Sequence, residues 1–405
     1  MSMGDGVWVN AGRGALITAG AAVISLRWMP GAWSDYTGSS GIVAFLLAVL
    51  LHAIPGALAL GIAGALEAQK WHPALALGLG MTIGEAACRW LPVPLGFTAG
   101  LVQAWVLLGP AALLGRPLLA GTIGAALGCA KNRRLLAVVA LFWLGSGRAF
   151  VDYGVQEQSV GIVQTGVDGF AARRPSASAD RAEQLVELTQ LDADWVLTPE
   201  SAWPYAMGQA RGGRAAFETT WQGHPPVLLG GWTDSEPAIN RIGLVVDGRV
   251  AAHVDKSFVI PFAEATAGFA AGDAGRDVRV AGGIVSVLVC WEDVLPRAIA
   301  AVSPMTDILA LPSSDVWLGP TGQRHHADAA RYAAVTTGRW VVRATPTGQS
   351  GLIDPRGQWR MRVAEDGAHV VQVPMRPRGW IPAWWGGWLG GLASIAAGIL
   401  WLLKR

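Results

Sequence analysis

Long stretches without a charged residue constrain this chain more than any other feature of its sequence. Residues 36–66 form an uncharged run of 31 residues, and residues 90–115 form another of 26. About 20 apolar residues are enough for a helix to cross the hydrocarbon core of a bilayer, so both runs are long enough to span a membrane. Only 15% of the 405 residues are charged, against roughly 25% in an average soluble domain. The sequence therefore predicts a chain that is partly embedded in a membrane.

Shorter apolar runs accompany the two long ones near the start of the chain. They cover residues 14–26, 71–84, 117–130 and 135–147. Together the runs predict that residues 1–150 form a transmembrane bundle of five to six helices. Glu85 is expected to mark the end of a span, and a functional carboxylate that faces the bundle interior is the alternative interpretation.

Another uncharged run, residues 379–403, lies near the other end of the chain and predicts one C-terminal transmembrane helix over 379–405. Tryptophans gather at its start, as in the aromatic belt of a membrane interface, and two basic residues follow it. A basic cluster at 131–134 precedes the last N-terminal run. Because basic residues tend to remain on the cytoplasmic side, we expect residues 151–378 to lie on the periplasmic, outer face of a bacterial cytoplasmic (inner) membrane.

The body, residues 151–378, alternates between strand and helix patterns, which predicts an α/β domain. Asp247 and Gly248 are expected to turn a hairpin over 242–253. Strands are expected at 160–164, 195–198, 226–231, 286–289, 308–311, 340–344, 351–353 and 369–373, and helices at 179–191, 292–302 and 326–337.

Polar residues follow three of these predicted strands: Glu200, Lys256 and Cys290. A cysteine where a strand gives way to a helix meets free backbone N–H groups and the positive end of the helix dipole. Both would favour the thiolate, and the N–H groups can bind an oxyanion. A buried structural cysteine is the alternative for Cys290 taken alone.

The three residues stand in the strings LTPESAWP, HVDKSFVIPFAE and VCWED, in that order along the chain. In this arrangement the body resembles the carbon–nitrogen hydrolase (nitrilase) superfamily, whose mark is a Glu, Lys, Cys triad. The body is most similar to the apolipoprotein N-acyltransferase branch. This similarity rests on three features: the flanking apolar runs, the string PFAE at residues 261–264, and the string SSDVWLGPTG at residues 313–322. This resemblance implies a nitrilase-like α-β-β-α sandwich domain inserted between the N-terminal transmembrane helices and one C-terminal transmembrane helix.

The resemblance also implies how the triad would act. Cys290 would attack a carbonyl and form a thioester. Glu200 would take the thiol proton, and a shielded carboxylate suits that task because its pKa lies nearer neutrality. Lys256 would remain charged and would stabilise the oxyanion together with the backbone N–H of Trp291.

Two further glutamates are expected to support the triad. Glu264 would orient Lys256 or share in proton movement, and Glu292 would hold the turn. An ordinary structural salt bridge is the alternative for both. The chain departs from the family pattern at Trp291, where tyrosine is common, at Ser314, where asparagine is common, and at residues 333–336, where Arg-Ala-x-Glu is usual. These differences leave the acyl-enzyme chemistry intact.

The main hypothesis is therefore a membrane-bound acyltransferase. It would take an acyl group from a membrane phospholipid and pass it to the amine of a lipoprotein or to another amine acceptor. Two alternatives remain: a membrane-anchored carbon–nitrogen hydrolase (amidase), in which water is the acceptor, and a non-catalytic nitrilase-like accessory protein of conjugal transfer. If the protein were such an accessory protein, replacing Cys290 would leave the cellular phenotype unchanged.

Cofactors, metals and nucleic acid have no place in this hypothesis. After residue 150, 22 Lys and Arg stand against 25 Asp and Glu, so no basic excess points to nucleic acid. Three scattered cysteines predict neither a disulfide framework nor a zinc site. His325 and His326 are adjacent, so their side chains point apart, and we expect them at the surface or at the rim of the site rather than on a metal.

Overall fold

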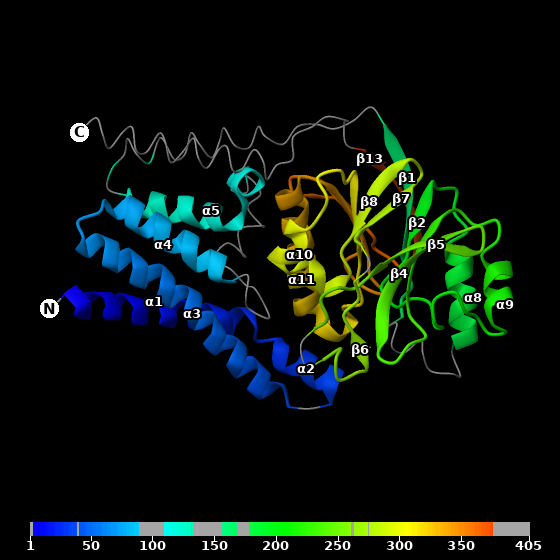
Figure 1. Ribbon diagram of the computed structural model, residues 1–405, viewed down its shortest axis with the longest axis horizontal. Helices are drawn as coiled ribbons and strands as arrows, with labels where there is room; N and C mark the ends of the chain where they lie inside the picture. Colours follow the sequence, from blue (N-terminus) through cyan, green and yellow to red (C-terminus); the bar gives the residue numbers. More distant parts are fainter. Residues whose placement is uncertain are drawn as a thin grey trace.

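The computed structural model describes residues 3–38, 40–88, 109–130, 132, 136, 156–167, 178–260, 263–273 and 275–375. A group of N-terminal helices stands beside an α/β body (Figure 1). The predicted spans at 135–147 and 379–403, and most of the one at 90–115, fall outside the described residues. The span count and the domain boundaries therefore stay predictions.

The N-terminal helices are α1 (Met3–Ser25), α2 (Met29–Thr37), α3 (Gly41–Ala68), α4 (Pro73–Ala87) and α5 (Gly109–Gly128). Glycine allows α1 and α3 to approach closely, since a Cβ at Gly14 would lie 1.9 Å from the carbonyl oxygen of Gly56. Pro55 does not divide α3, which continues as one helix of 28 residues. Glu85 lies in the last turn of α4 and is buried.

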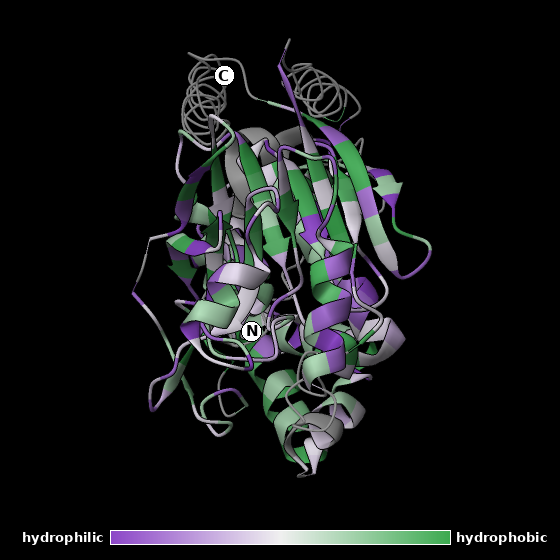
Figure 2. Cartoon of the chain, turned by 90° about the vertical axis from the view of Figure 1, so that its right-hand side faces the viewer, coloured by the Kyte–Doolittle hydropathy of each residue, from purple (hydrophilic) through white to green (hydrophobic). Residues whose placement is uncertain are grey.

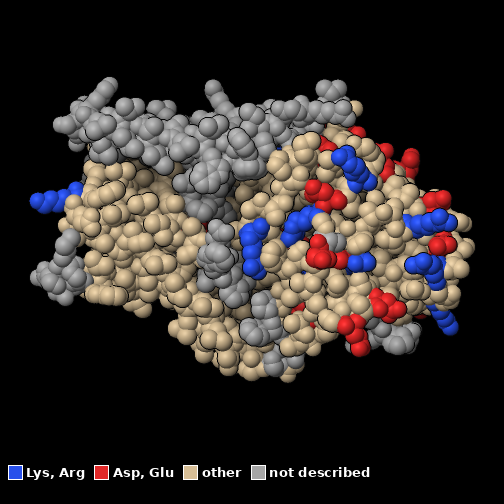
Figure 3. All heavy atoms as spheres, viewed as in Figure 1, with Lys and Arg blue, Asp and Glu red and all other residues tan. Residues whose placement is uncertain are grey.

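Two described helices are long and apolar enough to cross a membrane, α1 over Gly6–Ser25 and α3 over Gly41–Ala68. Their outward faces carry large apolar side chains, with Leu16 76%, Ile24 69% and Leu50 66% exposed. Acidic and basic side chains gather on the body and are nearly absent from the helical part on the face seen in Figure 3. Such a surface suits lipid rather than water.

Two β-sheets form the middle of the body. In the first, the strand order is β13-β1-β2-β3-β4-β5, with β6 paired to β4, and in the second it is β12-β11-β10-β9-β8-β7. The strands of the first sheet are β1 (Glu157–Gln164), β2 (Trp195–Leu197), β3 (Val227–Trp232), β4 (Ala238–Val246), β5 (Arg249–Asp255), β6 (Phe269–Ala270) and β13 (Gly367–Pro374). Those of the second are β7 (Asp277–Val280), β8 (Gly283–Val287), β9 (Ile308–Pro312), β10 (Trp340–Ala344), β11 (Gly351–Ile353) and β12 (Trp359–Arg362).

Both sheets have a parallel centre, β1-β2-β3 in one and β8-β9-β10 in the other. Parallel strands are normally covered on both faces, and β2 and β9 are buried at every position. The inner faces pack on each other, with Ile162 and Leu197 of the first sheet in one cluster with Val287 of the second. In Figure 2 the strands are mostly hydrophobic, as this burial requires.

Helices cover the two outer faces. On the first sheet lie α8 (Ser178–Leu188) and α9 (Arg214–Thr220), and on the second lie α10 (Pro296–Ala300) and α11 (Gly319–Thr337) (Figure 1). Leu185 of α8 packs with Val196 of β2, and Ala330 of α11 packs with Val341 of β10. The body is therefore a four-layer α-β-β-α sandwich, as the resemblance implied.

Most predicted elements of the body are present, but two of its helices differ from the prediction. The predicted helix over 292–302 is instead a 3-10 turn, η5 (Cys290–Asp293), followed by α10, because Pro296 lacks the N–H that a continuous helix needs. The helix predicted from residue 326 begins at Gly319, with Pro320 in its first turn. In the N-terminal part, α1 extends the run predicted at 14–26 back to Met3.

Trp28 makes one of the contacts between the N-terminal helices and the body. Trp28, just before α2, donates from Nε1 to Nδ1 of His325 at 3.0 Å. Its ring also fills the space beside Gly322, where a Cβ would come within 2.9 Å of it. The residue just before α2 thus packs against the first half of α11.

Candidate active site

Glu200 lies in the turn after β2, where the chain leaves the centre of the first sheet. It is 3% exposed, and Ser201 beside it has a left-handed backbone with φ of 54°. Asn240 donates to Oε1 of Glu200 at 2.5 Å, and the backbone N–H of Ser314 donates to Oε2 at 2.9 Å. Burial raises the pKa of Glu200 above its ordinary value, although the neighbouring Lys256 opposes that shift. Its carboxylate is thus a stronger base than an exposed one.

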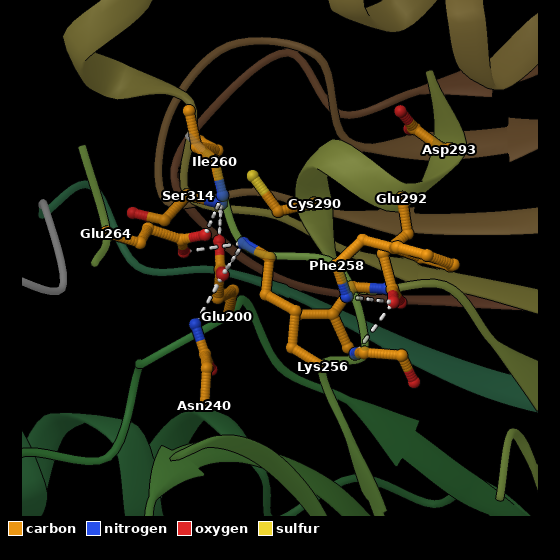
Figure 4. Close-up of polar contacts among 12 residues, drawn as sticks. Glu200, Asn240, Lys256, Phe258, Ile260, Glu264, Cys290, Glu292, Asp293 and Ser314 are labelled. Atoms are coloured by element: carbon orange, nitrogen blue, oxygen red, sulfur yellow. Dashed lines mark hydrogen bonds and ion pairs between the residues drawn. The ribbon is translucent and has the colours of Figure 1, made fainter. Parts of the chain in front are cut away.

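Lys256 follows β5 and is completely buried. Its Nζ lies 2.9 Å from Oε1 of Glu200 and 2.6 Å from Oε1 of Glu264. Burial alone would lower the pKa of Lys256, but the two carboxylates raise it well above the ordinary value. This direction favours the charged lysine that was expected, with its ammonium between two carboxylates (Figure 4).

Glu264 comes from the segment between β5 and β6. Besides its ion pair with Lys256, it accepts from the backbone N–H of Ile260 at 2.7 Å through Oε2. It is 4% exposed, so this pair is shielded from water. The position of Lys256 is consequently fixed from two sides, by Glu200 and by Glu264.

Cys290 is the first residue of η5, just beyond the end of β8. It is 4% exposed and has a φ of 51°, which non-glycine residues seldom adopt. Its side chain points to the same place as the Lys256 ammonium and the Ser314 backbone N–H (Figure 4). The structure thus brings Glu200, Lys256 and Cys290 together, across the two sheets, from positions far apart in the sequence.

The resting state of the cysteine differs from the sequence-based expectation. Burial, and after it the Glu200 carboxylate, raise the pKa of the Cys290 thiol well above its ordinary value, while Lys256 and the Ser314 N–H oppose them. The expectation that the turn favours the thiolate was therefore wrong. η5 is a single 3-10 turn, so no long helix directs its dipole at the sulfur. A protonated thiol beside a carboxylate needs that carboxylate as a base.

Glu292 holds the turn around Cys290, as predicted. It is fully buried and accepts backbone N–H groups of Val289 at 2.9 Å and of Ser257 at 2.9 Å. Arg276 pairs with it at 3.1 Å. Because one carboxylate binds the chain just before Cys290 and just after Lys256, it fixes the two segments relative to each other. Trp291 is half-buried and packs against the core under α10.

His326 is not at the rim of the site, so the prediction for it was wrong. It is 5% exposed and lies behind the Cys290 turn, where its Nε2 is 3.3 Å from the carbonyl oxygen of Cys290. His325 points the other way, to Trp28. Within the described residues, no group of three or more His, Cys, Asp or Glu side chains is arranged to hold a metal ion.

Sequence reasoning also missed Asn240, and it noted Ser314 only as a departure from the family pattern. Asn240 lies in β4 and Ser314 just beyond β9, and both donate to Glu200. Asn240 and Arg241 are the two polar residues of β4, and this interruption of an apolar strand was the local signal for Asn240. Nothing local marked Ser314, because its contact is made by the backbone.

Part of the body matches a known protein family. The family model for carbon–nitrogen hydrolases matches residues 248–381, which include Lys256, Glu264, Cys290 and Glu292. An apolipoprotein N-acyltransferase of Gloeobacter violaceus is 27% identical over 272 residues, which are 59% of this chain and 51% of that protein. One of Synechocystis is 24% identical over 290 residues, 65% of this chain and 56% of that protein.

The chain thus spans about half the length of the curated relatives it matches. A solved structure from Xanthomonas campestris, a carbon–nitrogen hydrolase superfamily protein with an arsenic adduct in its active site, is 15% identical in sequence. It covers 54% of this chain and 91% of its own, with a TM-score of 0.43.

Proposed function

Because the chain belongs to the carbon–nitrogen hydrolase (nitrilase) superfamily, we propose that it is a membrane-bound acyltransferase. In this proposal Cys290 takes an acyl group from a membrane phospholipid and transfers it to an amine, such as the N-terminal amine of a lipoprotein. The observation that carries the proposal is the buried Glu200–Lys256–Glu264 cluster beside Cys290. Similarity to apolipoprotein N-acyltransferases supports the class of reaction.

In the first half of the reaction, Glu200 removes the proton from the Cys290 thiol as the sulfur bonds to the carbonyl carbon of the lipid ester. The carbonyl oxygen becomes an oxyanion, which the Lys256 ammonium stabilises together with the backbone N–H of Trp291. The intermediate then loses the lipid alkoxide, which takes the proton back from Glu200. A thioester on Cys290 and a free lipid hydroxyl remain.

In the second half, an amine attacks the thioester carbonyl. Glu200 accepts a proton from the attacking nitrogen, and the same oxyanion site stabilises the second intermediate. Cleavage of the carbon–sulfur bond releases an amide, and the departing sulfur takes the proton from Glu200. Because Glu200 returns the proton at the end of each half, the site begins the next cycle unchanged.

In this proposal, the apolar faces of α1 and α3 attach the body to the membrane that contains its lipid substrate. A body attached to membrane helices is held near the depth of the ester bond, so the lipid need not be extracted into water before it reacts. The inner membrane of a bacterium, crossed several times by the chain, with the body on the periplasmic face, is the setting we propose. The charge pattern of the sequence supports this orientation.

Intact mass measurement of protein purified from membranes tests the acyl-enzyme. We expect a mass increment equal to a fatty acyl group on the wild type, which hydroxylamine removes and the Cys290→Ser variant lacks. A wild type without any increment, even after incubation with phospholipid vesicles, would contradict the proposal.

Transfer must then be separated from hydrolysis, since the superfamily is named for carbon–nitrogen hydrolases. The purified protein is incubated with phospholipid and with an N-terminal S-diacylglyceryl cysteine peptide, and products are identified by mass. We expect N-acylated peptide and lysophospholipid. Free fatty acid without acylated peptide would identify water as the acceptor and overturn the proposed transfer.

A further inference from the structure

A second buried charge cluster lies behind the Cys290 turn, outside the group formed by Glu200, Lys256 and Glu264. It consists of His326 in α11, Asp293 in η5, Asp315 just before η6 (Val316–Leu318), and Arg343 in β10. The side chain of His326 is 4% exposed, and the other three are completely buried. A buried charge is costly unless it is paired, so four buried ionisable groups should be paired with one another.

Both ring nitrogens of His326 face acceptors. Nε2 lies 2.9 Å from Oδ1 of Asp293 and 3.3 Å from the carbonyl oxygen of Cys290, and Nδ1 lies 3.3 Å from Oδ2 of Asp315. A neutral imidazole has one N–H only and would direct a lone pair at a carboxylate. The two carboxylates lie at ion-pair distance from the two ring nitrogens, and this placement of charge favours the doubly protonated ring. Burial alone would lower the pKa of His326, but Asp293 and Asp315 raise it to about 9, against the opposing charge of Arg343.

The charges of the cluster balance only when His326 carries its second proton. Nη2 of Arg343 pairs with Oδ2 of Asp315 at 2.9 Å. Within the described part of the chain, the ion-pair partner of Asp293 is His326. A neutral His326 would leave Asp293 as an unpaired buried carboxylate, which destabilises the folded state.

The turn that this cluster contacts is strained. Cys290 has a φ of 51°, and a non-glycine residue in such a conformation is strained and persists only where its surroundings hold it. Glu292 holds the N-terminal side of the turn through the N–H of Val289. The contact on the carbonyl side of Cys290 comes from His326.

We propose that His326 is a positioning residue: clamped as an imidazolium between Asp293 and Asp315, it donates to the carbonyl of Cys290 and holds the turn in the left-handed conformation that directs the thiol toward Lys256. This inference rests on the proposed role of Cys290 as the nucleophile. His326 acts through the backbone, on the side of the turn away from the substrate.

A water-soluble ester allows the inference to be tested without lipid. The rate constant of acylation by 4-nitrophenyl butyrate and the half-saturating ester concentration are measured between pH 6.5 and 10 for wild type, His326→Gln and His325→Gln, with Cys290→Ser as the background. For His326→Gln we expect acylation to slow at least tenfold at pH 7.5, with the half-saturating concentration unchanged within twofold. For His325→Gln, whose side chain faces Trp28, we expect wild-type rates within twofold.

The pH profile separates positioning from simple support of the fold. Wild type should lose activity as pH rises through about 9, where His326 gives up its second proton, and His326→Gln should lack this descending limb. Because the single variant leaves Asp293 unpaired and can unfold, the double variant His326→Gln/Asp293→Asn provides a folded form without that charge. We expect the double variant to melt close to the wild type and to react as slowly as the single variant.

The inference would be overturned if His326→Gln or the double variant were acylated at the wild-type rate. It would also be overturned if either of these two proteins kept the loss of activity above pH 9. The rate of Cys290 alkylation by iodoacetamide, located by peptide mass, distinguishes this failure from failure of the proposed function. If alkylation depends on His326 while no acyl-enzyme ever forms, the positioning stands and the acyltransferase proposal fails. If the acyl-enzyme forms equally fast without His326, the proposed function stands and the positioning fails.

Discussion

Lys256 is the residue on which the proposed chemistry depends most, because it is the only cation that contacts both Glu200 and Glu264 among the described residues. Replacing it by methionine keeps most of its volume and removes its charge. We expect Lys256→Met to slow acylation at least about 100-fold, the usual cost of losing one oxyanion contact. The measurement is the single-turnover rate with 4-nitrophenyl butyrate.

A stability effect should accompany this loss of activity. Without the ammonium, two buried carboxylates face each other, so we expect the apparent melting temperature of Lys256→Met to fall at pH 8 and to recover partly at pH 5, where a carboxylate takes up a proton. Lys70→Met is the matched control, because Lys70 is exposed at the end of α3. An active Lys256→Met protein would exclude the proposed role of the lysine.

The raised pKa of His326 should make the stability of the wild type depend on pH. Its pKa is raised in the folded protein from 6.5 to about 9, so the folded state binds this proton more tightly than the unfolded state does. The resulting stabilisation is fully present below pH 6.5 and is lost as pH rises through 9; a shift of this size corresponds to about 3 kcal/mol.

Thermal melting in detergent measures this dependence. We expect the wild-type melting temperature to fall by roughly 6–12 °C between pH 6.5 and 10, given 2–4 °C per kcal/mol for a domain of this size. His326→Gln should lose less over the same range. Equal slopes for the two proteins would mean that other groups cause the pH dependence.

The sequence revealed those site residues that follow an apolar strand. Glu200, Lys256 and Cys290 each interrupt or end such a run, and a polar group there has a local signal. The partners of His326 have no such local signal in the sequence. Asp293 and Asp315 lie 33 and 11 residues before it in the chain, and only the packing of η5 and α11 against the second sheet brings the three together.

At the level of elements, the turn η5 depends on Glu292, which links it to the segment after β5. Both carboxylate oxygens of Glu292 accept hydrogen bonds, and Glu292→Gln replaces one of them by an NH2 group, which cannot accept. A backbone N–H group or Arg276 therefore loses its acceptor. We expect a loss of about 2–4 kcal/mol of stability and slower acylation, since Cys290 and Lys256 are no longer fixed relative to each other.

Asp354 offers a matched control on another element. It accepts from the backbone N–H groups of Arg356 and Gln358 at 2.9 Å each, and pairs with Arg360 at 2.7 Å, at the turn between β11 and β12. Asp354→Asn should lower the melting temperature but leave the acylation rate of the remaining folded protein unchanged. If both variants lose activity in proportion to stability, Glu292 supports the fold in general and not the site.

The strands and helices themselves were predictable because their apolar pattern is local. The order of the strands in the sheets was not, since it requires knowing which runs pair, as β13 does with β1 across the length of the body. The break between η5 and α10 was signalled by Pro296, and the early start of α11 by Pro320. The predicted continuous helix overlooked the first signal, and the predicted start at residue 326 overlooked the second.

For the whole molecule, the question is whether the packing of the body against its apolar N-terminal helices matters for the proposed reaction. Trp28 donates to His325, and its ring packs against Gly322 in α11, the helix that also carries His326. If the body must be held at the depth of a lipid ester, loosening this contact should impair reaction with lipid and spare reaction with a soluble ester.

We therefore expect Trp28→Ala to slow acylation from phospholipid vesicles at least fivefold, while acylation by 4-nitrophenyl butyrate stays within twofold of wild type. The soluble ester is the internal control, because both reactions use the same Cys290, Glu200 and Lys256. Trp8→Ala is a second control: this tryptophan also lies on the membrane side but is 78% exposed. Equal slowing of both reactions would mean that Trp28 stabilises the site through α11, and no effect on either would mean that the docking contact does not govern access to lipid.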